Sequence, residues 1–219
     1  MHRLLTAVVA VSLLTVPATE VVQLDRAERL AVIAGTVEPA TYRGRKGLKL
    51  VEREINQGLG FAVLNGVEFG NGTIETEIAG LPAAGAVEGS RGFVGIAFHV
   101  QKDPQSYECF YLRPTNGRAD DQLRRNHATQ YISEPEFPWQ KLRQENPGVY
   151  ESYVDLEAGA WTPIRIVVDG AKAQFYVHNA PQPVLVVNDL KKGAISGGIA
   201  LWIGQGTEAY FSNISITRR

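Results

Sequence analysis

Cysteine is almost absent from this sequence, and so are several patterns that would define an enzyme class. Cys109 is the only cysteine, which excludes an intramolecular disulfide and a cysteine-based zinc site, and it is most simply a small buried apolar residue. The four histidines, at positions 2, 99, 127 and 178, show neither HxH nor HExxH spacing. No serine lies in a GxSxG motif. We therefore predict no metal centre, no cofactor and no nucleophile elbow.

An excess of one charge is also missing, because the formal net charge of the 219 residues is -1. The basic pairs 124–125 and 191–192 are short, so we predict no nucleic-acid partner. The apolar run 4–16 is shorter than the roughly 20 residues that a membrane span needs, so we predict no stable membrane span. It follows Met1-His2-Arg3 and ends at Val16-Pro17-Ala18, which is typical of a signal peptide. We predict a signal peptide over 1–18 and a periplasmic or secreted mature chain from about Thr19.

The pattern that dominates the rest of the chain is the alternation of apolar and polar residues in short segments. Segments 48–52, 61–65, 70–78, 93–100 and 107–114 alternate, and each is bounded by glycine, proline or polar residues. Asp169-Gly170 joins two further strands in a predicted hairpin, and segments 184–189, 197–204 and 208–216 follow as three more. Only two short helices are predicted, near Asp120 and at 138–144. The sequence therefore predicts an all-β fold, a two-sheet antiparallel sandwich with short helices in loops, as a single domain over 19–219.

Within that pattern, three segments carry a resemblance to a known fold. Trp161 opens a strand that ends at Asp169-Gly170, and Tyr176-Val177 lies in the next strand; this hairpin resembles the one in concanavalin A-like and laminin G-like jelly rolls. GTIETEI and GGIALWIGQGTEAYFSNISI resemble other strands of that fold. The chain is also loosely similar to the bacterial 3-keto-disaccharide hydrolase domains, through its strand order and Arg113. The resemblance implies a jelly-roll sandwich that hosts many functions.

The stretch 106–139 combines aromatic residues with side chains that form hydrogen bonds. Sugar rings stack on Tyr or Trp, and their hydroxyl groups need paired donors and acceptors. Loops longer than about 12 to 15 residues are usually functional or disordered, and the aromatic content here argues against disorder. The alternative is that the aromatics are core residues and that salt bridges fix the loop. The candidate ligand-binding residues are Tyr107, Tyr111, Arg113, Asn116, Arg118, His127, Gln130, Tyr131 and Trp139.

Three carboxylates are candidates for catalysis. Glu75 and Glu77 lie roughly 6.6 Å apart along one strand, within the separation of about 5 to 9.5 Å that glycosidases use. The concanavalin A-like glucanases carry Glu-x-Asp and a further Glu, but this strand has no third acid, so the pair is better explained as solvated surface charge. Glu108 alternates with Tyr107 and Arg113 along its strand, so it cannot share a face with them. If the tyrosines and Arg113 face the ligand, Glu108 points into the sandwich; if Glu108 faces the ligand, Arg113 is structural.

These observations support three hypotheses for the function. The first is an exported carbohydrate-binding jelly roll that holds a glycan on its concave sheet and the adjoining loop. The second is a glycoside or modified-disaccharide hydrolase on the same scaffold, with Arg113 or His127 stabilising charge. The third is a protein-interaction or structural module. Calcium could take oxygen ligands from Asp120 and Asp121, as in some laminin G-like domains, but their spacing matches no calcium loop.

Overall fold

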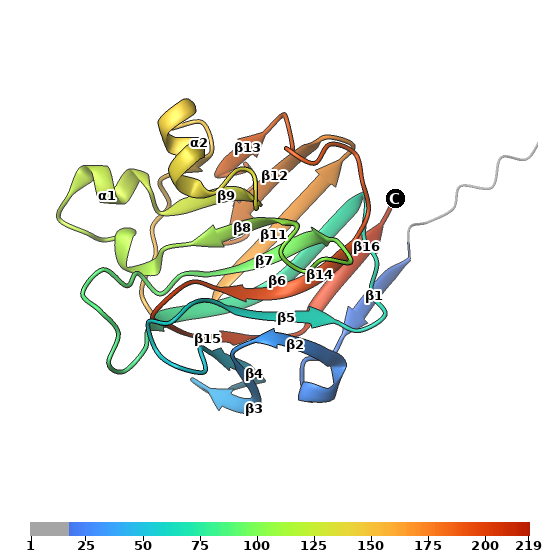
Figure 1. Cartoon of the computed structure of the whole chain (residues 1–219), viewed down its shortest axis with the longest axis horizontal. Coiled ribbons are helices and arrows are strands. Elements are labelled where there is room, and N and C mark those ends of the chain that lie inside the picture. The colour runs from blue at the N-terminus through green and yellow to red at the C-terminus, as the bar shows by residue number, and fades with distance from the viewer. Residues whose placement is uncertain (1–17) are drawn as a thin grey trace, which may run out of the picture.

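Two antiparallel β-sheets packed face to face make up the protein (Figure 1). The computed structural model describes residues 18–219. The larger sheet runs in the order β13-β12-β11-β6-β15-β4-β3, with β16 also paired to β6 and β1 paired to β16. The smaller sheet runs in the order β10-β9-β8-β7-β14-β5-β2. This arrangement confirms the predicted two-sheet antiparallel jelly-roll sandwich.

The strands of the larger sheet come from both ends and the middle of the chain. They are β1 (Thr19–Val22), β3 (Thr36–Tyr42), β4 (Arg45–Val51), β6 (Gly72–Pro82), β11 (Thr162–Asp169), β12 (Lys172–Val177), β13 (Leu185–Val187), β15 (Thr207–Phe211) and β16 (Ile214–Arg218). The smaller sheet contains β2 (Leu30–Ala34), β5 (Gly60–Leu64), β7 (Val94–Val100), β8 (Tyr107–Leu112), β9 (Thr129–Glu134), β10 (Glu151–Ser152) and β14 (Gly198–Ile203). Two α-helices, α1 (Gln122–Asn126) and α2 (Trp139–Glu145), and two 3-10 turns, η1 (Ala27–Arg29) and η2 (Pro114–Asn116), complete the described elements.

The core lies between the two sheets and consists of the apolar side chains that alternate along the strands. In β6, Ile74 and Ile78 are buried while Glu75 on the opposite face is exposed, as the period of two requires. Phe110 of β8 stacks on Phe175 of β12, with ring centroids 5.1 Å apart, so aromatic rings from the two sheets meet in the middle of the sandwich.

Three local features differ from the sequence-based expectation. The segment predicted as one strand over 208–216 is two strands, β15 and β16, which separate at Ser212-Asn213. Within the predicted polar loop, residues 129–134 form β9, a full strand beside β8. In β7 the pairing with β14 shifts by one residue before Val100, and His99 adopts a positive φ of 52°. That bulge turns the imidazole toward the core, whereas strict alternation would have placed it on the opposite face.

Both predicted helices are present and short. Asp121 caps α1, because its carboxylate accepts a hydrogen bond from the backbone N–H of Arg124 at 2.7 Å. Pro138 directly precedes α2, where its fixed φ suits the start of a helix. Figure 1 shows both helices at one end of the sandwich, close to β9.

Two predictions concern the beginning of the chain. The predicted signal peptide covers residues 1–18, and all but the last of these lie outside the described residues. Among residues 18–219, no helix combines the length and the apolar character that crossing a bilayer demands.

Candidate functional site

One row of side chains crosses the outer face of the smaller sheet. Partners in an antiparallel pair point to the same face, and the register places six residues of neighbouring strands in line. From β5 to β10 they are Phe61, Trp202, Gly95, Tyr111, Gln130 and Glu151. This row passes from aromatic residues at one edge to polar and charged residues at the other.

The aromatic part of the row is closely packed. Tyr111 and Trp202 stack with ring centroids 4.7 Å apart, above Gly95, and the indole N–H of Trp202 donates to the Tyr107 hydroxyl at 3.1 Å. A Cβ atom on Gly95 would lie 2.5 Å from Cβ of Tyr111, so the absence of a side chain makes the stack possible. Tyr107, Tyr111 and Trp202 are 4%, 2% and 7% exposed, so these rings fill the space that Gly95 and Ala97 leave above the sheet. Little of their surface remains for a sugar ring.

Arg113 lies at the end of β8, where the aromatic residues give way to polar ones. Its guanidinium donates to the Tyr111 hydroxyl at 2.8 Å, to Gln130 Oε1 at 3.0 Å and to the backbone carbonyl of His127 at 3.1 Å. The side chain is 6% exposed, and its burial lowers the pKa of Arg113. Burial also raises the pKa of Tyr111 to about 12, so this hydroxyl stays protonated at neutral pH and can accept from Arg113.

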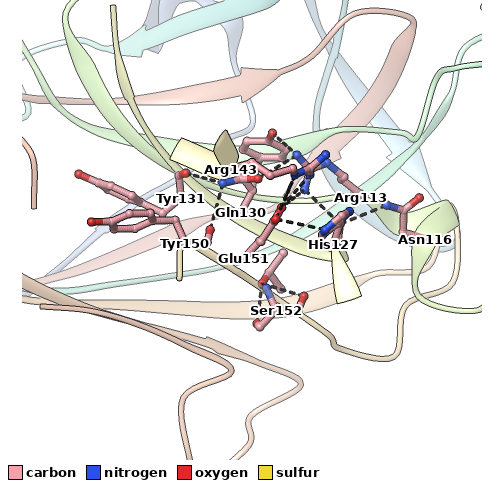
Figure 2. Close-up of polar contacts among 11 residues, drawn as sticks. Arg113, Asn116, His127, Gln130, Tyr131, Arg143, Tyr150, Glu151 and Ser152 are labelled. Carbon is pink, nitrogen blue, oxygen red and sulfur yellow. Dashed lines mark hydrogen bonds and ion pairs between the residues drawn. The ribbon is translucent and has the colours of Figure 1, made fainter. Parts of the chain in front are cut away.

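Glu151 supplies the negative charge at the polar edge. Its carboxylate accepts from Arg143 of α2: Nη2 donates to Oε2 at 2.7 Å, and Nε donates to Oε1 at 3.0 Å and to Oε2 at 3.2 Å (Figure 2). Nε2 of His127 is 3.1 Å from Oε1, and Nη1 of Arg113 is 3.9 Å from Oε2. The Glu151 side chain is 3% exposed, so a buried carboxylate joins β10, α2 and the turn after α1.

His127 is the group in this cluster that can titrate near neutral pH. Burial lowers its pKa below the ordinary 6.5, and Arg143 and Arg113 lower it further, while Glu151 acts in the opposite direction. The imidazole is therefore neutral at pH 7. Because Glu151 can only accept, the neutral ring carries its proton on Nε2 and leaves Nδ1 as an acceptor.

Two adjoining pockets open beside this cluster. The first, which we call the loop pocket, has a volume of about 290 Å³ and is lined by Gly89, Arg91, Phe93, Arg113, Asn116, Arg124, His127, Trp139 and Arg143. The second, the tyrosine pocket, has a volume of about 570 Å³ and is lined by Leu123, Asn126, His127, Arg143, Pro147, Gly148, Glu151, Ser152 and Tyr153. His127 and Arg143 line both, so the pockets form neighbouring parts of one depression.

Exposed aromatic rings occur in both pockets. Trp139 is 37% exposed and lies between two arginines, with the Arg143 guanidinium 4.6 Å and that of Arg113 5.8 Å from its ring centroid. Tyr153 is 42% exposed, and Arg125 lies 4.9 Å from its centroid. The site thus offers accessible aromatic faces next to fixed donors and acceptors.

The structure brings six of the nine predicted ligand-binding residues to this region. Arg113, Asn116, His127 and Trp139 line the loop pocket, and Tyr111 and Gln130 lie directly below through their bonds to Arg113. Tyr107 lies further along the aromatic row. Arg118 is instead on the surface, where it pairs with Asp155 at 2.9 Å and Glu157 at 3.0 Å. Tyr131 alternates with Gln130 and therefore points into the core, where its hydroxyl is 2.6 Å from Glu108.

The three candidate catalytic carboxylates lie away from the pockets. Glu108 is fully buried between the sheets. This matches the alternative in which Glu108 points into the sandwich and the tyrosines and Arg113 lie on the opposite face of the sheet. The Glu108 carboxylate contacts His99 Nδ1 at 2.7 Å and accepts from the Tyr131 hydroxyl at 2.6 Å and the Lys192 N–H at 3.2 Å. Glu75 and Glu77 lie on the outer face of the larger sheet, where Glu77 pairs with Arg45. The pair stands across the sandwich from the loop pocket.

Several residues of the site were not predicted from the sequence. Glu151 and Trp202 join it through sheet register, Arg91 through the loop before β7, and Arg124 and Arg143 through α1 and α2. The only signal available was the high density of arginine around 113–143. For a metal centre, residues 18–219 contain no group of three His, Cys, Asp or Glu side chains placed to hold an ion.

The comparisons with known proteins agree on the fold. No protein-family model matches the sequence, and no curated protein matches it. Among solved structures, the carbohydrate-binding module CBM66 from Bacillus subtilis is similar, with a TM-score of 0.60, 13% identity and coverage of 86% of this chain and 96% of that one. A Bacillus subtilis protein of unknown function with a galectin-like fold has a TM-score of 0.60, 10% identity and coverage of 91% and 96%. The Crh5 transglycosylase has a TM-score of 0.56, 12% identity and coverage of 91% and 84%.

These structures define the class of the fold. The chain shares with them a two-sheet antiparallel jelly-roll fold, which agrees with the fold that its resemblance in sequence implied. At 10–13% identity the similarity concerns the fold, and the chemistry must be argued from the pockets.

Proposed function

We propose that the protein is a carbohydrate-binding jelly roll that holds a glycan in the loop pocket and the adjoining tyrosine pocket. The observation that carries this proposal is the position of Trp139, whose exposed ring stands beside Arg113, His127 and Asn116 in a pocket of about 290 Å³. Such a volume is at the lower end of small-molecule sites and suits one sugar unit. The tyrosine pocket gives room for a second unit. The similarity to a carbohydrate-binding module supports the proposal through the fold.

We place the proposed site at the polar edge of the smaller sheet, whereas the sequence-based hypothesis placed the glycan on the face of the sheet and the adjoining loop. On the sheet itself the rings of Tyr111 and Trp202 pack against one another and are nearly buried. At the edge, Trp139 and Tyr153 expose aromatic surface next to groups that form hydrogen bonds. On the smaller sheet, stacking and hydrogen bonding are therefore available together at this edge.

Binding is better supported than glycoside hydrolysis. A hydrolase of the common type needs two carboxylates about 5 to 9.5 Å apart. Among the residues that line the two pockets, Glu151 is the one carboxylate, and it is engaged by Arg143 and His127. The site thus has the parts of a binding site without the pair of acids that this chemistry requires.

The test is a glycan panel in which both binding and product release are followed on the purified protein. We expect binding without turnover, and we expect Trp139→Ala to weaken it at least about tenfold, because truncating a central aromatic contact typically costs over 1.4 kcal/mol. The matched control is Tyr176→Ala, since Tyr176 also lies under an arginine, Arg165 at 3.7 Å, but on the larger sheet. Binding that survives Trp139→Ala and falls in the control would contradict the location. Product release would favour the hydrolase.

A further inference from the structure

The loop pocket has an unusual distribution of charge. Four of its nine lining residues are arginines, Arg91, Arg113, Arg124 and Arg143, and none is Asp or Glu. These residues come from separate parts of the chain: the loop before β7, the end of β8, α1 and α2. The fold therefore concentrates positive charge in one place, although the whole chain has a formal net charge of -1.

The neighbouring carboxylate balances only part of this charge. The Glu151 carboxylate accepts hydrogen bonds from Nε and Nη2 of Arg143 and lies 3.9 Å from Arg113. Arg91 donates to the backbone carbonyls of Glu88 and Ser90, and Arg124 donates to that of Thr115 at 3.5 Å. Within the part of the chain that the structure describes, neither Arg91 nor Arg124 forms an ion pair. Two guanidiniums thus line the pocket without a carboxylate partner in contact.

Two residues that line the pocket also carry a buried polar atom that lacks a protein partner. Nε of Arg124 and Oδ1 of Asn116 are both buried, and neither forms a hydrogen bond within residues 18–219. Buried polar groups in folded proteins nearly always have partners, and one left unpaired is costly. Burial and the nearby charge of Arg124 lower the pKa of Arg91, and Glu88 partly offsets this shift. An anion in the pocket would accept from the accessible guanidinium N–H groups and offset their charge.

We propose that the ligand of the loop pocket is an acidic sugar, whose carboxylate or sulfate group is bound by Arg91 and Arg124 while its ring lies against Trp139. This inference rests on the proposed carbohydrate-binding function and adds the chemical class of the ligand. Guanidinium groups suit both anions, because their planar N–H donors match pairs of oxygen atoms. Arg113 and Arg143 are held by the protein and position the site.

Matched sugars test the proposal directly. Calorimetry would compare three oligomers whose rings share the galacto configuration: neutral galacto-oligosaccharide, oligogalacturonate and a sulfated galactan oligomer. We expect at least one acidic oligomer to bind tenfold or more tightly than the neutral one, and the arm that binds identifies the carboxylate or the sulfate. Binding should weaken between about 0.1 M and 1 M salt, because the Debye length falls from about 10 Å to about 3 Å.

Two variants assign the effect to the arginines. Arg124→Gln and Arg91→Gln each remove a charge and should weaken binding of the acidic oligomer about ten- to a hundredfold, in line with the cost of losing a hydrogen bond to a charged group. Arg165→Gln is the matched control, because Arg165, like Arg91 and Arg124, lines a surface pocket and forms no ion pair among the described residues, but it lies on the larger sheet. It should change affinity by less than about twofold. If a variant fails to fold, the affinities of the unmodified protein for the neutral and acidic oligomers, and their dependence on salt, still show whether the ligand is acidic.

The outcomes separate this inference from the proposed function. Equal affinity for neutral and acidic oligomers, with Arg124→Gln unchanged and Trp139→Ala impaired, overturns the acidic ligand and leaves carbohydrate binding intact. Absence of binding to all sugars in the panel overturns both. Acid-specific binding that is lost in both arginine variants and kept in Arg165→Gln supports both.

Discussion

Replacing Glu108 by alanine should destabilise the protein strongly without touching the ligand site. The Glu108 carboxylate is fully buried and meets three groups: His99 Nδ1 at 2.7 Å, the Tyr131 hydroxyl at 2.6 Å and the Lys192 N–H at 3.2 Å. The other imidazole nitrogen, His99 Nε2, donates to the carbonyl of Gly70 at 3.0 Å. The network therefore ties β7, β8 and β9 to the segment before β14.

The magnitude follows from the groups that alanine would leave unpaired. Each buried donor or acceptor without a partner costs about 1–3 kcal/mol, and removing one partner of a buried ionisable pair typically costs about 3–5 kcal/mol. Because the Tyr131 hydroxyl still accepts a hydrogen bond from the Lys191 N–H, we expect Glu108→Ala to lower the free energy of unfolding by about 3–5 kcal/mol. At roughly 2–4 °C per kcal/mol for a chain of this length, the melting temperature should fall by about 6 to 20 °C.

Glu108→Gln provides the internal comparison. The glutamine carbonyl can accept from Tyr131 and Lys192, and the glutamine amide can donate to His99 Nδ1. The free energy of unfolding should therefore fall by about 1 kcal/mol or less. Chemical denaturation and calorimetry measure both variants, and Glu75→Gln serves as an exposed control. A Glu108→Ala variant within about 1 kcal/mol of the unmodified protein would refute the structural role. A well-folded Glu108→Gln variant that has lost sugar binding or turnover would refute its separation from the site.

Three further predictions concern other parts of the molecule. Gly95→Ala should destabilise by about 1–3 kcal/mol, since its Cβ would lie 2.5 Å from Cβ of Tyr111; denaturation curves that match the unmodified protein would contradict this. Glu52→Ala should cost about 3 kcal/mol or more, because the carboxylate accepts from the N–H groups of Gln57, Gly58 and Thr207 at 3.1–3.3 Å; resistance of the 52–58 segment to proteolysis in the variant would argue otherwise. Because the pKa of His127 lies below 6.5, acidification from pH 7.5 to below that pKa should add a positive charge and strengthen binding of an acidic oligomer. In His127→Asn the affinity should vary little over that range, and a steep dependence there would assign the titration to another group.

The fold could be predicted because its signals are local. Alternation in β6 and β8, the Asp169-Gly170 hairpin and the glycine boundaries each depend on a few adjacent residues. Strand β9 was not predicted, because Thr129–Glu134 follows a run of polar residues and is stabilised by pairing with β8. The turn of His99 toward Glu108 requires a bulge, and a bulge depends on the partner strand.

The site was predictable only in part for the same reason. Arg113, His127 and Trp139 could be selected as polar or aromatic residues of one long loop, and the structure gathers them around one pocket. Glu151 could not be selected from the sequence, because it joins the row of Tyr111 and Gln130 only through the register between β9 and β10. The burial of Tyr111 was equally invisible in the sequence, since it depends on Trp202, which lies 91 positions further along (202 - 111).

The most direct test of the account uses the three tryptophans as reporters. Trp139 lies in the loop pocket, Trp202 in the aromatic row of the smaller sheet, and Trp161 on the larger sheet, where its indole donates to the carbonyl of Tyr42 at 3.0 Å. Nitrogen-15 spectra of the three indole N–H groups would be followed while oligogalacturonate is added, with the neutral galactose oligomer as comparison. We predict a saturable shift of the Trp139 signal, larger for the acidic oligomer, with Trp161 unchanged. A shift confined to Trp202 or Trp161, with Trp139 unmoved, would contradict the account.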